Sequence, residues 1–452
     1  MPGHKYLFRT VLCFLSVIFL SASAPGLGQN NPSVTKIALV GGSLIDGSGA
    51  APLENAVLLI ENGLIADIGV LGDLQIPEDY IVISTEGRTI LPGLWDMHVH
   101  LLYAGHTNYP YWHQNYTEQF AENIMPATAL QLLQAGVTSA RDLGAPPESV
   151  FRVRDQIAAN ELPGPTLYVA GPQLTPEPPG WAQFYRRNIA GSANAQEQAN
   201  ALVERQADVL KISNAEGLRL EDVRSVVDIA HAQNLKVTAH GRSDAEIEIG
   251  LQGGVDEFQH IGLNSERYPD SVMRLIEERI DNGEELFWTP TIGLQLRAGT
   301  AAENRELLDD PENFLGLADN TVRDILTSMG NYDPDPVQAG IVVSKISQLR
   351  EAGVRLLVGT DAGLSGNPHS QAIWQEMLSW VEMLGIAPLE TIHAATALPA
   401  QVMGVDNLVG TLEVGKYADI VVVHGDPLAS MRVLSDPELV IKHGQIMFDR
   451  RP

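Results

Sequence analysis

The chain has 452 residues and a formal net charge of −27, with 29 Lys and Arg residues against 56 Asp and Glu residues. Hydrophobic residues make up 44% and charged residues 19%, a globular balance that excludes a disordered or fibrous chain. Because so acidic a surface repels phosphate groups and anionic lipids, nucleic acid is excluded as an expected partner. We expect a small-molecule substrate instead, and about two or three domains.

The first 28 residues have the pattern of a signal peptide. Lys5 and Arg9 form a basic start, residues 11–20 are largely apolar, and small residues follow at 21–28. The apolar run is shorter than the roughly 20 residues that a membrane span needs, although an uncleaved anchor is the alternative. We therefore expect an exported protein, periplasmic or secreted, with no stable membrane insertion after cleavage. The only cysteine, Cys13, lies in this segment, so a mature chain would bind metal through nitrogen and oxygen atoms.

Short apolar runs separated by turns occur at both ends of the remaining chain. Asn62-Gly63, between two such runs, is typical of a tight hairpin. The predicted strands are residues 36–40, 56–60 and 64–68 at one end and 419–423, 439–441 and 445–448 at the other. We predict that the two ends pair into one small β-sandwich domain, with its halves at residues 29–92 and 398–452.

Strand and helix patterns alternate between these ends. The eight predicted strands are residues 90–97, 136–140, 166–170, 208–212, 236–239, 256–258, 285–288 and 354–358. Helical periodicity separates most of them, as at residues 220–232. The alternation predicts an α/β fold with a (β/α)8 TIM barrel over residues 93–397. A doubly wound open sheet is the alternative, but no glycine-rich phosphate loop follows a strand.

Side chains that can bind metal ions occur where five of these strands end, and in a TIM barrel those ends meet at one face. They are His98 and His100 on the first strand, Lys211 on the fourth, His240 on the fifth, His260 on the sixth and Asp361 on the eighth. Since side chains alternate along a strand, His98 and His100 point to the same side. Each residue alone has a structural explanation as a core histidine, a buried lysine or a turn aspartate. Their joint occurrence predicts a metal site.

This constellation, together with two sequence segments, resembles the amidohydrolase superfamily. The segments are ILPGLWDMHVH at residues 90–100 and GTLEVGKYADIVVVHGDPL at residues 410–428. The likeness extends over residues 36–450. It is greatest to the binuclear branch of the superfamily, in the imidazolonepropionase-like and prolidase-like dipeptidase group, whose members hydrolyse dipeptides and N-acyl amino acids.

The resemblance implies two divalent metal ions, with Zn²⁺ the best match to all-nitrogen and oxygen ligands. It implies the ligands His98, His100, Lys211, His240, His260 and Asp361. It also implies that CO2 converts Lys211 into a carbamate that bridges the ions. A bridging hydroxide would then attack the amide bond of a dipeptide or N-acyl amino acid, with Asp361 as the catalytic proton carrier.

Three other functions stay open at this point, two catalytic and one non-catalytic. A lactone or carbamate hydrolase would share this machinery and differ only in its substrate pocket. A mononuclear heterocycle deaminase would use the histidines and Asp361 but would not need Lys211. A catalytically silent barrel that only binds metal or ligand is the alternative from another class of protein.

Aromatic and basic residues gather in the predicted loops after the strands, where a substrate would bind. The predicted substrate contacts are Tyr103, His106 and Trp112 after the first strand, Arg242 after the fifth and His369 after the eighth. A packed lid would explain the aromatic residues equally well, and a surface ion pair with Asp244 or Glu246 would explain Arg242. Barrels of this kind often assemble, which leaves a homo-oligomer open.

Overall fold

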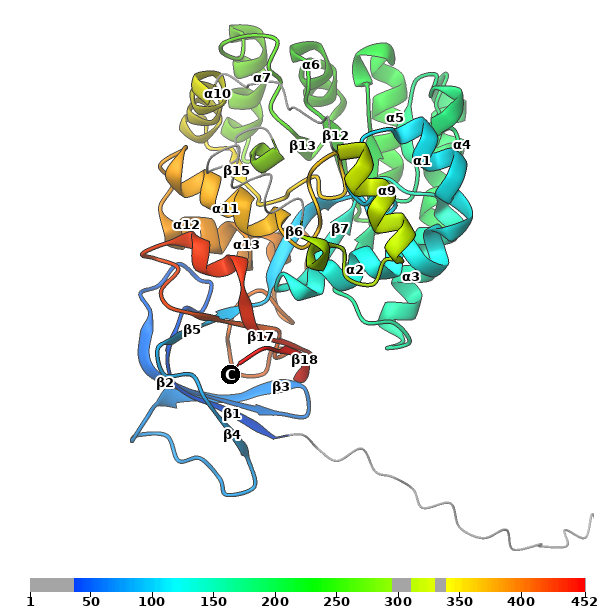
Figure 1. Ribbon diagram of the computed structural model, residues 1–452. Coiled ribbons are helices and arrows are strands. Elements are labelled where there is room, and N and C mark those ends of the chain that lie inside the picture. The colour runs from blue at the N-terminus through cyan, green and yellow to red at the C-terminus, as the bar shows by residue number, and fades with distance from the viewer. Residues whose placement is uncertain (1–35, 295–309, 330–338, 452) are drawn as a thin grey trace, which may run out of the picture. The chain divides into compact units, whose positions relative to one another are not determined.

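The computed structural model describes residues 36–294, 310–329 and 339–451, so the predicted signal peptide lies outside the described residues. The described strands form one eight-stranded sheet and two parallel sheets, of seven and three strands (Figure 1). Helices cover the parallel sheets. In the described part of the chain, no helix has the length and apolar character needed to cross a membrane.

The eight-stranded sheet combines strands from both ends of the chain, as predicted. Its strands are β1 (Ile37–Leu44), β2 (Leu53–Glu61), β3 (Leu64–Val70), β4 (Ile81–Ser84), β5 (Arg88–Pro92), β16 (Ile420–His424), β17 (Pro437–Lys442) and β18 (Gln445–Asp449). The blue strands of the N-terminal end lie beside the orange and red strands of the C-terminal end (Figure 1), because β16 pairs with β5 in antiparallel fashion. Asn62 and Gly63 have φ values of 55° and 83° and form the predicted hairpin turn between β2 and β3.

The parallel sheets contain the strands predicted from the alternating pattern. The smaller sheet contains β6 (Leu94–Val99), β7 (Val137–Asp142) and β8 (Thr166–Val169). The larger contains β9 (Gln173–Thr175), β10 (Arg186–Asn188), β11 (Val209–Ile212), β12 (Lys236–His240), β13 (Glu257–Gln259), β14 (Phe287–Thr289) and β15 (Arg355–Leu356). Backbone hydrogen bonds join the two sheets on both sides. Asp208 N donates to Val169 O over 2.9 Å, and Asp361 N donates to His98 O over 2.7 Å.

The prediction of a single strand over residues 90–97 is wrong. Residues up to Pro92 belong to β5 in the eight-stranded sheet, whereas residues from Leu94 belong to β6 in a parallel sheet. Gly93 lies between them, and a Cβ atom there would lie 2.1 Å from Thr138 Oγ1. Apolar side chains are buried on both sides of Gly93, so the hydrophobic pattern contains no sign of the boundary.

The described helices pack their apolar faces against the parallel strands. On α5 the buried residues Val223, Val226, Val227 and Ala230 repeat at helical spacing. The helices are α1 (Tyr109–Tyr116), α2 (Met125–Gln134), α3 (Pro147–Ala158), α4 (Ser192–Glu204), α5 (Leu220–His231), α6 (Asp244–Gly253), α7 (Asp270–Asp281), α9 (Asp319–Met329), α10 (Ala339–Glu351), α11 (Ala372–Glu382), α12 (Pro388–Ala394) and α13 (Ala397–Val402).

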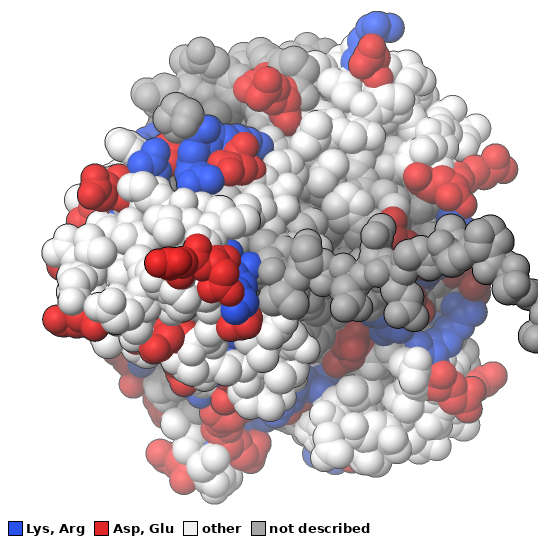
Figure 2. Space-filling model, turned by 90° about the horizontal axis from the view of Figure 1, so that it is seen from below, with Lys and Arg blue, Asp and Glu red and all other residues white. Residues whose placement is uncertain are grey.

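The surplus of acidic residues is dispersed over the face in Figure 2. Acidic side chains, in red, occur in separate groups, and several of them adjoin blue lysine or arginine side chains. The net charge of −27 therefore acts on this face as a diffuse field and not as one acidic patch.

A buried carboxylate on α11 makes the stability of the fold depend on pH. Glu376 accepts hydrogen bonds from the backbone N–H groups of Ile292 and Gly293 and from the indole of Trp380. Burial outweighs these donors and raises the pKa of Glu376 from 4.5 to about 7. Between these two pH values the folded chain holds a proton that the unfolded chain has lost. The stabilisation is therefore complete below pH 4.5 and is lost as the pH rises through 7.

We expect Glu376→Gln to remove this pH dependence. Relative to the variant, the free energy of unfolding of the wild-type protein should fall by about 3 kcal/mol between acidic and mildly alkaline pH. Denaturant titrations of both proteins at matched pH values measure the difference. A difference that stays constant with pH would contradict the prediction.

Candidate metal centre

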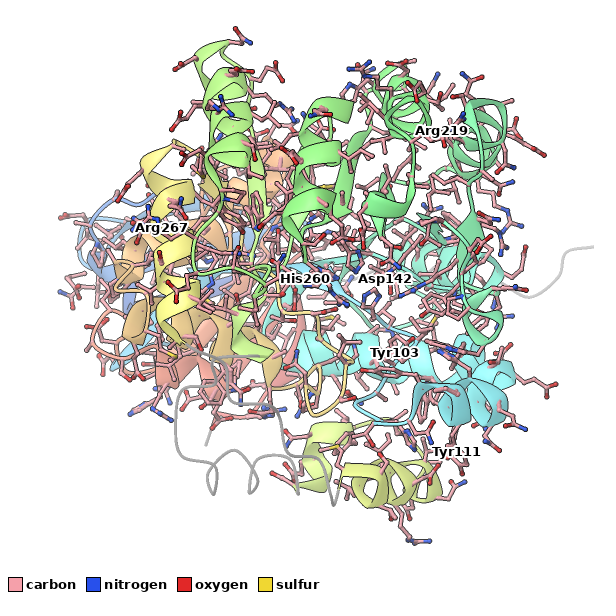
Figure 3. All side chains as sticks on the ribbon, turned by 90° about the horizontal axis from the view of Figure 1, so that it is seen from above. Tyr103, Tyr111, Asp142, Arg219, His260 and Arg267 are labelled. Atoms are coloured by element: carbon pink, nitrogen blue, oxygen red, sulfur yellow. The ribbon has the colours of Figure 1, made fainter. Side chains whose placement is uncertain are left out.

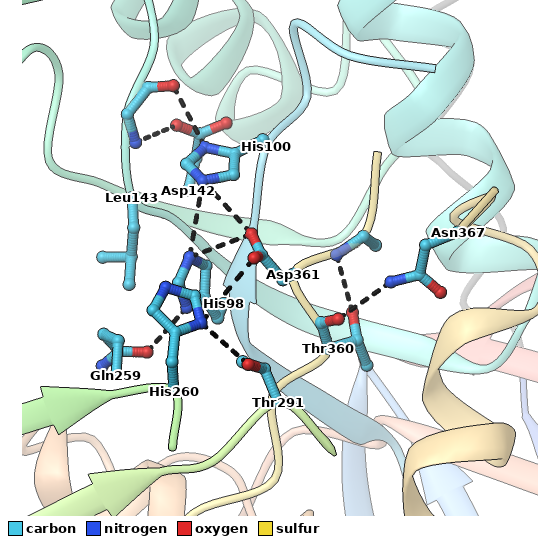
Figure 4. A network of polar contacts seen from close by, with 12 residues as sticks. His98, His100, Asp142, Leu143, Gln259, His260, Thr291, Thr360, Asp361 and Asn367 are labelled. Carbon is cyan, nitrogen blue, oxygen red and sulfur yellow. Dashed lines mark hydrogen bonds and ion pairs between the residues drawn. The ribbon is translucent and has the colours of Figure 1, made fainter. Parts of the chain in front are cut away.

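Two histidines and an aspartate converge where β6 and β15 end. His98 Nε2 and His100 Nε2 are 3.4 Å apart, and they lie 3.3 Å and 3.4 Å from Asp361 Oδ1 (Figure 4). All three side chains are buried, and one ligand atom of each lies within 4.8 Å of the others. The H-x-H spacing on one strand therefore places both rings on the same side, as predicted.

The other three predicted ligands lie in the same group. His260 follows β13, and its Nδ1 atom is 3.7 Å from Asp361 Oδ2. The ring of His240, at the end of β12, is 4.9 Å from the ring of His260 between centroids. Lys211 on β11 is completely buried, and a charge on its amine would lower the pKa of His98, His100 and His240. The structure thus brings all six residues together.

Burial determines the charge state of these groups. It lowers the pKa of His98, His240 and His260 well below their usual range and that of His100 to about 3, so these rings are neutral at pH 7. Burial also lowers the pKa of the Lys211 amine well below its usual value. Neutral imidazoles present the lone pairs that metal binding requires, and the lowered pKa of Lys211 favours the uncharged amine that carbamate formation requires.

A further aspartate, which the sequence analysis did not single out, holds Asp361 in place. Asp96 Oδ2 accepts a hydrogen bond of 2.6 Å from Thr360 Oγ1, and Asp96 Oδ1 accepts from the backbone N–H groups of Thr360 and His98. Asn367 Nδ2 donates to Thr360 O over 2.8 Å (Figure 4). These contacts fix the backbone at Asp361, whose φ is 58°. The position of Asp96, two residues before His98, was the available signal.

Unpartnered polar atoms show that the site fits a metal centre. In the described chain, Lys211 Nζ, His240 Nδ1, His260 Nε2 and Asp361 Oδ1 are buried without a hydrogen-bond partner. A buried polar atom that makes no hydrogen bond costs free energy, and a bound metal ion would satisfy several such atoms in one place. Nitrogen and oxygen donors of this kind suit a divalent ion such as Zn²⁺.

The predicted substrate residues after β6 occupy two different places. Tyr103 lies beside the metal centre, since its ring is 6.0 Å from that of His100, and its hydroxyl donates to Tyr185 over 3.1 Å. Trp112 is fully buried and donates from Nε1 to Leu102 O. His106 stacks on Tyr111, with 5.4 Å between the centroids. In the view of Figure 3, Tyr103 lies between His260 and Tyr111, and Tyr111 is the farther of the two tyrosines from His260. The contacts of Trp112 and His106 hold the loop together, as the packed-lid alternative expected.

His369 is buried beside the metal centre. The backbone of His100 faces its ring, and a Cβ atom on Gly363 would meet both His369 Cε1, at 2.9 Å, and His100 O, at 2.5 Å. Burial lowers the pKa of His369 to about 3, so its ring is neutral.

Two arginines near the centre have no acidic partner among the described residues. The Arg242 side chain is exposed, and Glu246 accepts from its backbone N–H and not from its guanidinium group. Arg186 lies on β10. Its Nε atom is buried without a partner, and its guanidinium group lies 5.3 Å from the Tyr185 ring centroid. Only the folded structure can show which arginines of an acidic protein lack a counterion.

Comparisons with known proteins agree with this geometry. A profile of the amidohydrolase family matches residues 89–447. Ochratoxinase from Aspergillus niger is 25% identical, with 88% of this chain and 83% of that protein covered. Imidazolonepropionase from Geobacillus kaustophilus is 24% identical, with coverage of 89% and 94%. The crystal structure of a proposed prolidase from Bifidobacterium longum has a TM-score of 0.71 and 27% identity, with coverage of 93% and 96%.

The family match spans both parallel sheets and most of the C-terminal strands. The relatives include the imidazolonepropionase-like and prolidase-like proteins that the sequence analysis expected. Members of the family generally bind metal ions, in agreement with the buried His98, His100 and Asp361 group. The chain belongs to the amidohydrolase family and is a hydrolase that acts on carbon–nitrogen bonds.

Proposed function

We propose that the protein is a binuclear metal-dependent amidohydrolase that cleaves an amide bond in a dipeptide or an N-acyl amino acid. The observation that carries this proposal is the convergence of six buried ligand candidates, four of which have unpartnered polar atoms. Enzymes named ochratoxinase and imidazolonepropionase among the relatives support hydrolysis of carbon–nitrogen bonds.

We also propose the finer architecture that the sequence predicts. The eight parallel strands β6, β7, β8 and β11–β15 would close into a (β/α)8 barrel, supported by the hydrogen bonds at both edges of the two parallel sheets. The eight-stranded sheet would fold over as a β-sandwich. One hydrophobic cluster that contains Leu39, Leu58, Ile90, Val422 and Leu439 supports this, because these residues come from both ends of the chain.

The six residues would divide between two metal ions. His98, His100 and Asp361 would hold one ion, and His240 and His260 the other. Lys211 would supply the bridge as a carbamate, in which its uncharged Nζ bonds to the carbon of CO2 and releases one proton. Complete burial, the lowered pKa and the absence of a hydrogen-bond partner in the described chain all support this role for Lys211.

Bound divalent ions would supply an acidified water and polarise the scissile carbonyl. Residues of the chain move the proton of the attacking water. Asp361, buried in the group with His98 and His100, accepts the proton of the attacking water and delivers it to the leaving amine. Asp96 and Thr360 keep the Asp361 backbone in place. Tyr103, Tyr185 and His113 form a hydrogen-bonded wall beside the centre.

The two unpartnered arginines favour a substrate with a free carboxylate. A guanidinium group binds a carboxylate through paired hydrogen bonds, and dipeptides and N-acyl amino acids both carry a free carboxylate.

We expect Arg242→Met and Arg186→Met each to raise KM for such a substrate by about 10- to 100-fold, the value of one hydrogen bond to a charged group. Arg187→Met is the matched control, because Arg187 donates to Gln183 O. Steady-state kinetics with the free acid and its methyl ester measure the effect. Equal KM increases for acid and ester would contradict it.

Metal content and a substrate panel test the proposed function together. We expect about two zinc-like ions per chain and loss of activity on chelation, restored when zinc is returned. The panel compares N-acyl amino acids and dipeptides with lactones, carbamates and heterocyclic amines. One ion per chain with ammonia release would favour the deaminase, and lactone or carbamate turnover without amide turnover would favour those hydrolases. Metal binding without any turnover would indicate a silent barrel.

We further propose that the protein is exported through the signal peptide at residues 1–28. The basic start and the apolar run of that segment support this. N-terminal sequencing of the protein recovered from the culture medium or the periplasm tests it. A protein found only inside the cell with Met1 retained would overturn it.

A further inference from the structure

The side-chain amide of Gln259 joins the metal centre to a polar network inside the parallel sheets. Gln259 Oε1 lies 2.7 Å from His98 Nδ1 (Figure 4). Gln259 Nε2 donates to Glu257 Oε1 over 2.6 Å and to Thr238 Oγ1 over 2.7 Å. All four side chains are buried, with exposures between 0% and 1%. No solvent therefore competes for these hydrogen bonds.

The orientation of the amide is fixed by its partners. The hydroxyl hydrogen of Thr238 is donated to the Glu257 carbonyl oxygen, so Thr238 Oγ1 can only accept from Gln259. Both hydrogens of the Gln259 amide are therefore used, one by a carboxylate and one by a hydroxyl. The amide oxygen is left facing His98.

The Glu257 carboxylate, which accepts from Gln259, is held in turn by Arg141. Glu257 Oε1 accepts from Arg141 Nη2 over 2.5 Å and from Thr289 Oγ1 over 2.6 Å. Arg141 Nε donates to Met97 O over 2.9 Å, and the arginine is completely buried. Because one member of a buried ion pair is costly without the other, Arg141 and Glu257 keep each other in place. The pair anchors the Gln259 amide through Glu257 on the same strand, β13, and through Arg141 on β7 of the smaller sheet.

This anchored amide dictates which nitrogen of His98 carries hydrogen. An amide oxygen only accepts, so His98 Nδ1 must donate, and a neutral ring then has no hydrogen on Nε2. That Nε2 atom is the one that lies 3.3 Å from Asp361 Oδ1 and 3.4 Å from His100 Nε2. We propose that Gln259 is a positioning residue that holds His98 in the tautomer whose Nε2 binds metal, with Arg141 and Glu257 fixing its amide. The proposal rests on the metal centre of the proposed function.

The tautomer can be read directly in the metal-free full chain. Long-range ¹H–¹⁵N NMR of protein labelled with ¹⁵N-histidine distinguishes the two nitrogens of each ring, and His98→Gln identifies the His98 signals by their loss. We expect wild-type His98 to carry hydrogen on Nδ1. We expect Gln259→Met, which has similar volume but no acceptor, to lose that preference. Hydrogen on Nε2 in the wild-type protein would overturn the proposal without any variant.

Zinc affinity gives the second measurement, by competition with a chromophoric chelator. Loss of a partner that orients a metal-binding histidine weakens metal binding by about 10- to 100-fold, which we expect for Gln259→Met. Thr238→Val is the comparison: it removes one of the two hydrogen bonds that orient the Gln259 amide but leaves the bond to Glu257 and the partner of His98, so we expect a much smaller loss than in Gln259→Met. Equal losses in both variants, or none in Gln259→Met, would overturn the proposal.

Thermal unfolding of each variant separates these effects from loss of the fold. If Gln259→Met does not fold, Gln259→Asn takes its place, because it keeps the amide but is one methylene too short to reach His98. The two proposals fail in different ways. A wild-type protein that binds no zinc refutes the metal centre, whereas the wrong tautomer in the metal-free chain refutes the role of Gln259.

Discussion

Lys211→Ala is expected to lower kcat/KM by about 10³-fold or more, a loss of at least 4 kcal/mol of transition-state stabilisation. The reason is that Lys211 would provide the bridging anion that two closely spaced cations need. Its amine is fully buried, and no acid of the described chain forms an ion pair with it. The same variant should bind about one metal ion fewer per chain, which elemental analysis of the purified protein measures.

A matched control variant and a chemical rescue distinguish the proposed role of Lys211 from that of a buried structural lysine. Lys345 is also completely buried, but its amine donates to Gly262 O over 2.6 Å. Lys345→Met should therefore alter stability and leave the metal content at the wild-type value. Adding a short-chain carboxylic acid to Lys211→Ala should restore part of the activity, because a free carboxylate can occupy the space of the carbamate. A Lys211→Ala protein with full metal content and wild-type kcat/KM would refute the carbamate bridge.

Asp361→Asn is expected to lower kcat by about 10³-fold with a much smaller change in KM. Asparagine keeps the shape and one oxygen of the side chain but cannot accept the proton of the attacking water. Asp361 is buried, with its Oδ1 atom 3.3 Å from His98 Nε2 and 3.4 Å from His100 Nε2. Steady-state kinetics and metal analysis of the same sample separate lost proton transfer from lost metal. A variant that keeps its metal and more than a tenth of the wild-type kcat would show that another group moves the proton.

Much of the site could be predicted from the sequence, because it depends on strand ends. Parallel strands with their C-terminal ends at one face bring distant residues together, so His240 and His260 could be placed beside Lys211 from their positions alone. The two-residue spacing of His98 and His100 fixed their common direction. Side-chain alternation and strand order were sufficient for these residues.

Other features depend on contacts that a linear pattern does not contain. The sequence placed a domain boundary between residues 92 and 93, but the apolar side chains on both sides of Gly93 gave no sign that one strand ends and another begins there. The sequence of the aromatic loop was equally compatible with a substrate wall and with a packed lid. In the structure, Tyr103 lies beside His100, whereas Trp112 is fully buried in the loop. The sequence could not separate Arg186 from the adjacent Arg187, because the absence of a counterion is a property of the whole fold.

The pairing of β5 with β16 has a consequence for how the polypeptide acquires its structure during synthesis. Thr89 Oγ1 donates to Gly425 O, a residue 336 positions later in the chain. A ribosome must therefore complete nearly the entire polypeptide before β5, which also pairs with β1, can pair with β16, and until then its other apolar edge is open to wrong partners. Contacts between such distant residues slow folding. Truncation of the last few dozen residues would therefore leave an aggregating chain, although those residues supply none of the six metal-ligand candidates.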